Sequence, residues 1–290
     1  MSEINEILNI MGVSGVERQI QQIQTEERLK LISFWDIPKG AKILEIGCGQ
    51  GDTTAALAYI VGDNGFVQGI DTAPESYGTP FTLGQARDKL MKSAVASHIK
   101  IDFETDFLSD EVSLAMPHFD IVVLSHCAWY FNNENILGST LGKARQLADR
   151  LCLAEWNITP RLPEQVLHCI AVMIQAECEC FQENSLSNVR TLFTPFDLLR
   201  VAKEAGWTVT KTANVFSPQL QDGAWEVSRT LAEYPNIVNS IEAMPRKLKE
   251  LLLSRIELLK NSDKDKDRLF ALDTFAFSGE HSFPGASRNK

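Results

Sequence analysis

The sequence KILEIGCGQGDTTAALAYIVGDNGFVQGID, residues 42–71, contains the strongest fold signal in the chain. It opens with an apolar run, residues 43–46, which is typical of a buried parallel strand. Three glycines, which allow sharp turns and close approach to a ligand, follow at alternate positions: Gly47, Gly49 and Gly51. The pattern then predicts a helix over 53–61 and a second strand over 66–70, with Asp71 at the tip of that strand. An acidic side chain there can accept both hydroxyls of a ribose, so the stretch predicts a nucleoside-binding β-α-β unit.

Glu45 and Asp52 indicate which nucleoside cofactor this unit binds. A dinucleotide fingerprint requires glycine at the position of Asp52, which we instead expect to cap the following helix. Glu45 would repel a pyrophosphate, but it suits a ligand that carries an ammonium and a sulfonium group. The segment LEIGCGQG, residues 44–51, resembles the first motif of the class I S-adenosylmethionine-dependent methyltransferases. With Asp71 following, the resemblance implies S-adenosyl-L-methionine as cofactor and S-adenosyl-L-homocysteine as product, and it disfavours a nicotinamide dehydrogenase.

Composition narrows the class of partner. The chain has 290 residues and a formal net charge of −10, which argues against a nucleic-acid partner because binding to phosphates needs a basic footprint. No apolar run approaches the length that spans a bilayer, and we find no signal-peptide core, so we expect no membrane partner and a cytoplasmic location. The six cysteines are then expected to be reduced thiols. The oligomeric state stays open.

Hydrophobic periodicity extends the first unit into an α/β chain. Further strands are expected at 99–105, 119–124, 151–154, 208–216 and 269–277. Helices are expected between them, among others at 138–150, 164–181 and 246–260. The resemblance implies a Rossmann-like methyltransferase fold, with a mostly parallel seven-stranded sheet whose last strand is antiparallel. We expect residues 1–40 to form an N-terminal helical cap and residues 41–290 the S-adenosylmethionine-binding methyltransferase domain, with helical insertions near 157–192 and 217–268.

The resemblance also suggests which residues hold the cofactor. The candidates are Glu45, Gly47, Gly49, Gly51, Asp71, Thr72, Asp106, Phe107, Ser125 and His126. By resemblance, Asp106 bonds the adenine amino group and Phe107 packs on the ring, whereas a plain aspartate that starts a turn is the alternative. N-terminal helices often fold over the cofactor in this family. Arg18, Gln22 and Arg28 are therefore candidates for the methionine carboxylate, although each also fits a solvated helix face.

Two residues at strand ends are the catalytic candidates. His126 lies two residues beyond the predicted strand 119–124, at the sheet edge where ligands bind in open α/β folds. Imidazole titrates near neutral pH, so His126 can take a proton from an attacking hydroxyl, phenol or amine. Its alternative role is to hydrogen-bond the backbone around the cofactor. Glu155 follows strand 151–154 and can orient or deprotonate a substrate, or be an ordinary strand-end carboxylate.

Aromatic side chains near the same edge are expected to wall the substrate pocket: Tyr77, Trp129, Tyr130, Trp156 and Trp225. Tyr77 belongs to a long loop, and long ordered loops at such an edge tend to be functional. Trp225 belongs to Leu220–Glu226, a segment that we expect to close over the site. Simple core aromatics are the alternative for the two that follow strand 119–124. No metal is expected, because residues 125–131 lack the carboxylate cluster that Mg²⁺ requires.

The function that the sequence favours is methyl transfer from S-adenosylmethionine to a small-molecule acceptor by in-line displacement at an oxygen, nitrogen or sulfur atom. The resemblance is to fungal and bacterial methyltransferases of secondary metabolism. A methyltransferase-like enzyme that catalyses an eliminative or pericyclic step with the cofactor bound is one alternative, and a non-catalytic binding protein is another. The identity of the acceptor stays open.

Overall fold

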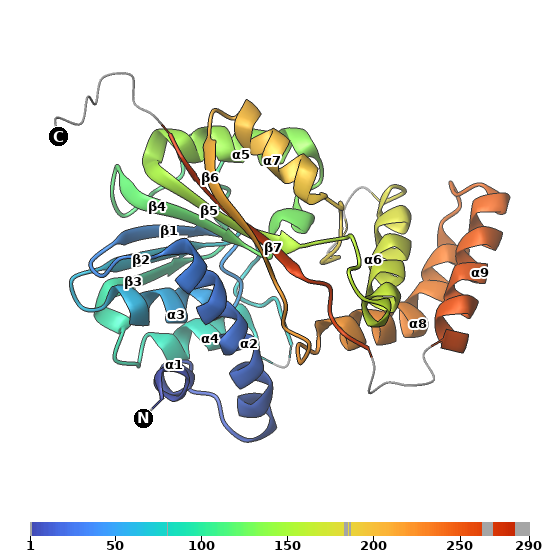
Figure 1. The fold of residues 1–290 in the computed structure, drawn as a ribbon, viewed down its shortest axis with the longest axis horizontal. Helices are drawn as coiled ribbons and strands as arrows, with labels where there is room; N and C mark the ends of the chain where they lie inside the picture. Colours follow the sequence, from blue (N-terminus) through green and yellow to red (C-terminus); the bar gives the residue numbers. More distant parts are fainter. Residues whose placement is uncertain (1, 80, 183–184, 186, 263–268, 282–290) are drawn as a thin grey trace.

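One seven-stranded sheet organises the computed structural model, which describes residues 2–79, 81–182, 185, 187–262 and 269–281. The strands are β1 (Lys42–Ile46), β2 (Phe66–Ile70), β3 (Ile99–Asp102), β4 (Phe119–Ser125), β5 (Ala148–Trp156), β6 (Thr208–Val215) and β7 (Thr274–Glu280). Their order is β3-β2-β1-β4-β5-β7-β6, with parallel pairing from β3 to β5 and antiparallel pairing of β7 with both neighbours (Figure 1). This confirms the predicted mostly parallel sheet with an antiparallel last strand.

Alternating side chains of the central strands build an apolar core on each face of the sheet. On one face, Ile43 and Ile121 pack against α1 (Glu3–Ile10), α2 (Gly15–Trp35) and α3 (Asp52–Val61). On the other face, Leu44 and Val122 pack against α5 (Glu134–Leu147) and α7 (Pro195–Glu204) (Figure 1). The strand order reverses between β1 and β4, so the crevice at their carboxyl ends is where this fold binds ligands.

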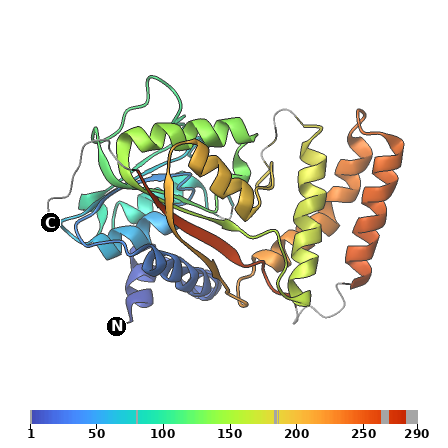
Figure 2. The same cartoon turned by 45° about the horizontal axis from the view of Figure 1, so that its top comes forward.

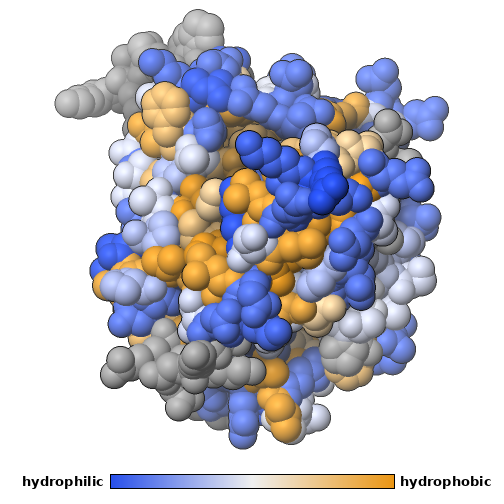
Figure 3. Space-filling model, turned by 90° about the vertical axis from the view of Figure 1, so that its right-hand side faces the viewer, coloured by the Kyte–Doolittle hydropathy of each residue, from blue (hydrophilic) through white to orange (hydrophobic). Residues whose placement is uncertain are grey.

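Three helices form a group of their own beside the sheet (Figures 1 and 2): α6 (Val166–Glu179), α8 (Asp222–Ser240) and α9 (Arg246–Ser262). They share an apolar cluster that includes Ile174 of α6, Tyr234 of α8 and Leu252 of α9. Hydrophobic side chains also gather on the outer side of the molecule at this end, ringed by hydrophilic ones (Figure 3). None of the described helices has the length and apolar character needed to cross a membrane.

The predicted boundaries were wrong at several strand and helix ends. β5 begins at Ala148 rather than at residue 151, because α5 starts and ends earlier than predicted. α5 begins at Glu134 rather than at 138, since the Asn133 side chain caps it by accepting a hydrogen bond from Ile136 N. β3 is shorter than predicted and ends at Asp102. These corrections change the bounds of the elements but not the order of the strands in the sheet.

Two further predictions were wrong near the site. β7 begins at Thr274 rather than at 269, because the preceding residues bond to the α6 region: Phe270 N donates to Glu164 O. Asp52 does not cap α3; it is the first residue of that helix, and Gly51 is the N-cap in the left-handed region. Helix α8 lies within the helical insertion expected near 217–268, although its own bounds were not predicted. Its N-terminus contributes to the site.

Another helix beside the sheet, α4 (Leu83–Leu90), follows the long loop after β2. Thr82 caps it by accepting a hydrogen bond from Gln85 N. The loop thereby returns from the carboxyl edge of β2 along a fixed path.

Candidate active site

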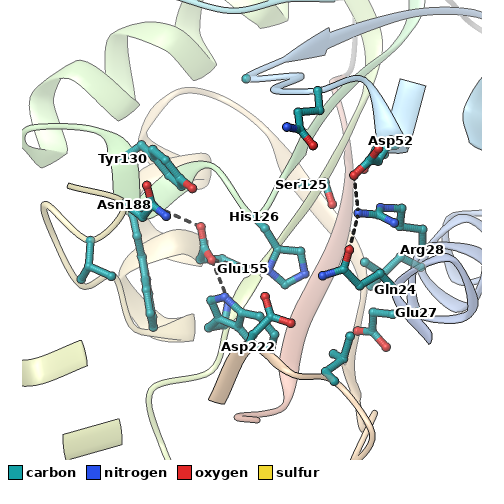
Figure 4. Close-up of a pocket in the computed structure, with 18 of the residues that line it drawn as sticks. Gln24, Glu27, Arg28, Asp52, Ser125, His126, Tyr130, Glu155, Asn188 and Asp222 are labelled. Carbon is teal, nitrogen blue, oxygen red and sulfur yellow. Dashed lines mark hydrogen bonds and ion pairs between the residues drawn. The ribbon is translucent and has the colours of Figure 1, made fainter. Parts of the chain in front are cut away.

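Two cavities meet at the carboxyl edge of the sheet. The outer cavity, of about 570 Å³, lies over the ends of β1 and β2 and is lined by Asp71, Thr72, Asp106 and Phe107, among other residues. The inner cavity, of about 260 Å³, lies between this edge, α2, α6 and the start of α8 (Figure 4). Three residues line both cavities: Gly47, His126 and Tyr130. The two spaces therefore form one site with a junction at those residues.

The glycine loop between β1 and α3 forms the floor of this junction. A Cβ atom on Gly47 would lie 2.7 Å from the Cys127 Cβ, and Gly47 has a φ of +77°, so the position requires glycine. Gly49 lines the outer cavity, and a Cβ there would meet no atom within 4 Å, which leaves open space for a ligand. Gly51 lines neither cavity and caps α3 instead.

Asp71 is held in a fixed orientation at the end of β2. Its Oδ2 accepts a hydrogen bond from Gly49 N at 2.8 Å, and its Oδ1 accepts one from Ala73 N at 2.9 Å. Each carboxylate oxygen keeps a further acceptor site, since an ionised carboxylate has about four. Asp71 can therefore accept two hydroxyl groups in the outer cavity.

Asp106 and Phe107 line the same cavity further along the edge. Asp106 Oδ1 accepts a hydrogen bond from Leu108 N at 2.9 Å, which fixes the turn and leaves the other oxygen to the cavity. Phe107 is 4% exposed and offers an apolar surface. Thr72 lies beside them. The outer cavity thus combines acceptors for hydroxyl and amino groups with an apolar wall.

Glu45 faces the inner cavity and is 2% exposed. It accepts a hydrogen bond from Thr54 Oγ1 at 2.5 Å. Burial raises the pKa of Glu45 to about 8, because removing a carboxylate from water costs more than the hydrogen bond from Thr54 and the nearby charge of Arg28 return. A cationic ligand group in this part of the cavity would stabilise its charged form.

Of the three candidates on α2, Arg18, Gln22 and Arg28, it is Arg28 that lines the inner cavity. Its Nη2 lies 3.1 Å from Asp52 Oδ2, so the pair sits at the entrance of the glycine loop (Figure 4). Arg18 instead donates to the side chains of Asn5 and Asn9. Gln22 lines neither cavity.

His126 stands at the junction of the two cavities. It follows β4 with a φ of +51°, and its backbone N–H donates a hydrogen bond to Ala154 O at 2.9 Å. Its Nδ1 lies 3.7 Å from Glu155 Oε1 and makes no hydrogen bond to any described residue, whereas its Nε2 lies 3.4 Å from Thr274 Oγ1. Burial opposes the charged imidazole, but the Glu155 carboxylate outweighs it, so the pKa of His126 is raised. The ring is therefore suited to take up a proton.

Glu155 is 1% exposed and is held by two backbone amides. Trp129 N donates to Oε2 at 3.1 Å, and Trp156 N donates to Oε1 at 2.9 Å (Figure 4). A carboxylate bonded in this way keeps a fixed position beside the His126 ring. The geometry suits orientation of His126 better than deprotonation of a substrate.

The expected aromatic residues divide between the cavities. Trp129, Tyr130 and Trp156 line the inner cavity, and the Trp156 ring centroid lies 4.6 Å from that of His126. Tyr77 lines the outer cavity. Trp225 is 46% exposed and belongs to neither set of lining residues.

Ser125, the last residue of β4, also lines the inner cavity, and so do Leu220, Asp222 and Glu226 of the segment expected to close over the site. Glu27 and His168 were missed entirely as site residues. Leu272 N donates to His168 Nδ1 at 3.0 Å, and burial lowers the pKa of His168 to about 3, so this histidine is neutral. Within the described ranges, no group of three or more histidine, cysteine, aspartate or glutamate side chains is arranged to hold a metal ion.

Comparisons with known proteins agree with this geometry. The family model of protein-L-isoaspartate(D-aspartate) O-methyltransferase matches residues 14–96. Methyltransferase phomM' of Diaporthe leptostromiformis is 30% identical over 271 residues, covering 72% of this chain and 70% of the relative. The crystal structure of a cyclopropane-fatty-acyl-phospholipid synthase-like protein from Lactobacillus casei superposes with a TM-score of 0.86 at 33% identity, covering 96% of this chain and 98% of that one.

A further match is shorter. The demethylmenaquinone methyltransferase of Bacillus pumilus is 48% identical over 44 residues, or 15% of this chain and 19% of the relative. The two longer similarities carry the assignment, and they agree with the glycine loop, the acidic strand end and the strand order. The chain belongs to the class I S-adenosylmethionine-dependent methyltransferases, which use S-adenosylmethionine as methyl donor.

Proposed function

We propose that this enzyme methylates a small-molecule acceptor in the inner cavity, with the adenosine part of S-adenosylmethionine in the outer cavity. The single observation that carries this division is the junction of the two cavities at Gly47, His126 and Tyr130. When bound, the cofactor supplies an electrophilic methyl group on a sulfonium. An acceptor that enters from the α6 and α8 side would approach that group across His126.

The residues present fit the cofactor. Asp71 offers oriented acceptors for the ribose hydroxyls, and Gly49 leaves room for the ligand beside it. Asp106 and Phe107 suit the amino group and the ring of an adenine. Glu45 is a buried acid without a paired cation, which suits a ligand with positive charge. We therefore assign these residues to the cofactor, with Thr72 and Ser125 beside them.

His126 is the proposed base and Glu155 its positioning residue. A neutral His126 takes the proton of the attacking group, and its Nδ1 lies 3.7 Å from Glu155 Oε1. The Glu155 carboxylate, fixed by two amides, then stabilises the imidazolium. Most of the acceleration should come from holding the nucleophile close and collinear with the methyl group.

The remaining assignments follow from position. Trp129, Tyr130 and Trp156 are proposed to wall the acceptor, and Tyr77 to close the outer cavity, whereas Trp225 receives no role. We also keep residues 1–40 as a cap and the inserted helices as a lid over the inner cavity. A cytoplasmic location remains part of the proposal, and the six cysteines, all free thiols, support it.

The test is incubation of the enzyme with trideuteromethyl-labelled S-adenosylmethionine and a small-molecule extract of the source organism. Mass spectrometry should reveal a product that carries one trideuteromethyl group, formed only with active enzyme and labelled cofactor. An extract in which every compound keeps its mass, while the cofactor remains bound, would contradict methyl transfer.

A further inference from the structure

Carboxyl groups dominate the wall of the inner cavity. Six of them line it: Glu27, Glu45, Asp52, Glu155, Asp222 and Glu226. Among the described lining residues, Arg28 is the one lysine or arginine, and it is paired with Asp52. His168 is neutral, since burial lowers its pKa to about 3. The cavity therefore carries more carboxyl groups than Arg28 and His126, its two basic groups that can hold a charge, are able to balance.

Three of these carboxyl groups have no role in the proposed cofactor site, in the pair with Arg28 or in positioning His126. Glu45 and Asp52 lie at the glycine loop, and Glu155 is held by backbone amides. Asp222 and Glu226 come from the first turns of α8, and Glu27 comes from α2. Figure 4 shows Asp222 beside the His126 ring, with Glu155 and Glu27 on either side. These three acids thus surround the proposed base where the acceptor must lie.

Glu27 supplies an independent sign of a missing partner. The residue is 4% exposed, and its Oε2 accepts a hydrogen bond from Ser217 Oγ. Its Oε1 is buried and has no hydrogen-bond partner in the part of the chain that the structure describes. A buried acceptor without a donor costs about 1–3 kcal/mol, more when it is charged, so a donor group in the cavity would stabilise this side chain.

The burial of the two acids on α8 also favours a cationic ligand in this cavity. Burial raises the pKa of Asp222 and that of Glu226, because the loss of water around their charged forms outweighs the nearby positive charges. The indole of Trp156 lies next to the His126 ring, and Trp129 forms another wall. Aromatic faces attract cations, and acids next to aromatic faces are a common arrangement for binding substituted ammonium groups.

We infer that the methyl acceptor is an amine, which enters the inner cavity as an ammonium ion held by Glu27, Asp222 and Glu226. The inference rests on the proposed function and names its substrate class. Neutral His126 takes one proton from the ammonium, and the freed nitrogen lone pair forms the new N–C bond. The C–S bond of the donor breaks, and its electron pair stays on sulfur. The proton carries one positive charge to His126, and the positive charge of the sulfonium passes to the methylated nitrogen, so both charges lie among the same carboxylates after the reaction.

An alcohol or a carboxylic acid would fit the same wall less well. A carboxylate would be repelled by the three acids, and a hydroxyl would leave their charge unbalanced. Binding measured by calorimetry on the enzyme saturated with S-adenosylhomocysteine distinguishes these classes. The probes are two matched sets: 2-phenylethylamine, 2-phenylethanol and phenylacetate, and 3-methylbutylamine, 3-methylbutanol and 3-methylbutanoate.

We expect the amine of at least one set to bind at least about tenfold more tightly than its alcohol and acid, a difference of about 1.4 kcal/mol. Asp222→Asn should weaken amine binding by about tenfold or more and leave alcohol binding and S-adenosylhomocysteine binding unchanged. The matched control is Glu233→Gln on the same helix, an exposed acid paired with Arg229 outside the cavity lining, which should change nothing.

The outcomes separate the inference from the function on which it rests. Failure of S-adenosylhomocysteine itself to bind would defeat the proposed function. Binding of S-adenosylhomocysteine without any amine binding at millimolar concentration would overturn only the amine inference. The amine inference would also be overturned if the alcohol or the acid bound as tightly as the amine in both sets. It would be overturned as well if the Asp222→Asn variant bound the amine with the affinity of the wild type.

Discussion

Asp71→Ala removes the proposed acceptor of both ribose hydroxyls from the outer cavity. In the structure, two backbone amides orient the carboxylate: Gly49 N lies 2.8 Å from Oδ2 and Ala73 N lies 2.9 Å from Oδ1. Each oxygen keeps a further lone pair for the ligand. The alanine variant loses these acceptors and leaves the two amides to water.

The magnitude follows from the number of bonds lost. A hydrogen bond to a charged group contributes about 1.5–3 kcal/mol, and each 1.4 kcal/mol is tenfold in affinity. Loss of one such bond would weaken binding by about tenfold or more, and loss of both by about 150-fold at the lower energy. We therefore expect the Kd for S-adenosylhomocysteine to rise by about 10- to 150-fold in Asp71→Ala.

Isothermal calorimetry measures this change, and thermal unfolding establishes that the variant is folded. Asp102→Ala is the matched control, because Asp102 ends the neighbouring strand β3, bonds Gln68 and pairs with Lys100, yet lines neither cavity. Its Kd should equal that of the wild type. A folded Asp71→Ala variant with an unchanged Kd would refute the ribose assignment, and an equal loss in Asp102→Ala would trace the effect to the strand rather than to the ligand contact.

Four further predictions concern the junction and its surroundings. His126→Gln should lower kcat by about 10²–10⁴-fold with little change in S-adenosylhomocysteine affinity; loss of affinity with kcat intact would make His126 a cofactor ligand instead. Because the pKa of His126 is raised, the acid limb of the rate profile should lie above the ordinary histidine range, and Glu155→Gln should move it to lower pH; a limb that stays in place would exclude Glu155 as the positioning residue. Gly47→Ala should destabilise the fold by about 2–5 kcal/mol in denaturant unfolding, since its Cβ would lie 2.7 Å from that of Cys127 at a positive φ, and a neutral effect would show that the loop can relax. Burial raises the pKa of Glu45 above its unfolded value to about 8, so the stability that this carboxyl contributes is present below its ordinary pKa and is lost as pH rises through about 8. This loss should be absent in the Glu45→Gln variant. An identical pH dependence of unfolding in both proteins would contradict the prediction.

The parts of the fold that local patterns specify were predictable from the sequence. The apolar run before Gly47, the glycine spacing and the acid at Asp71 are set by neighbours in the chain, and they identified the first β-α-β unit and the family. The nearness of His126 to Glu155 also followed, because the carboxyl ends of adjacent parallel strands meet at one edge.

The inner wall of the site was not predictable in the same way. The segment Leu220–Glu226 was expected to close over the site, and Asp222 and Glu226 do line the inner cavity, but no role was predicted for either acid. Glu27 looks like any acid on a polar helix, and His168 sits in an apolar helix stripe. Their roles depend on how the inserted helices pack against α2 and the sheet edge, which no local pattern records.

A crystal structure of the complex with S-adenosylhomocysteine tests the division of the site most directly. The account predicts ribose hydroxyls within hydrogen-bond distance of the Asp71 carboxylate, the adenine beside Asp106 and Phe107, and the sulfur at the junction next to Gly47 and His126. The part of the inner cavity that Glu27, Asp222 and Glu226 line is left for the acceptor. A complex in which the ribose binds away from Asp71, or in which the ligand fills the inner cavity and leaves the outer one to solvent, would contradict it.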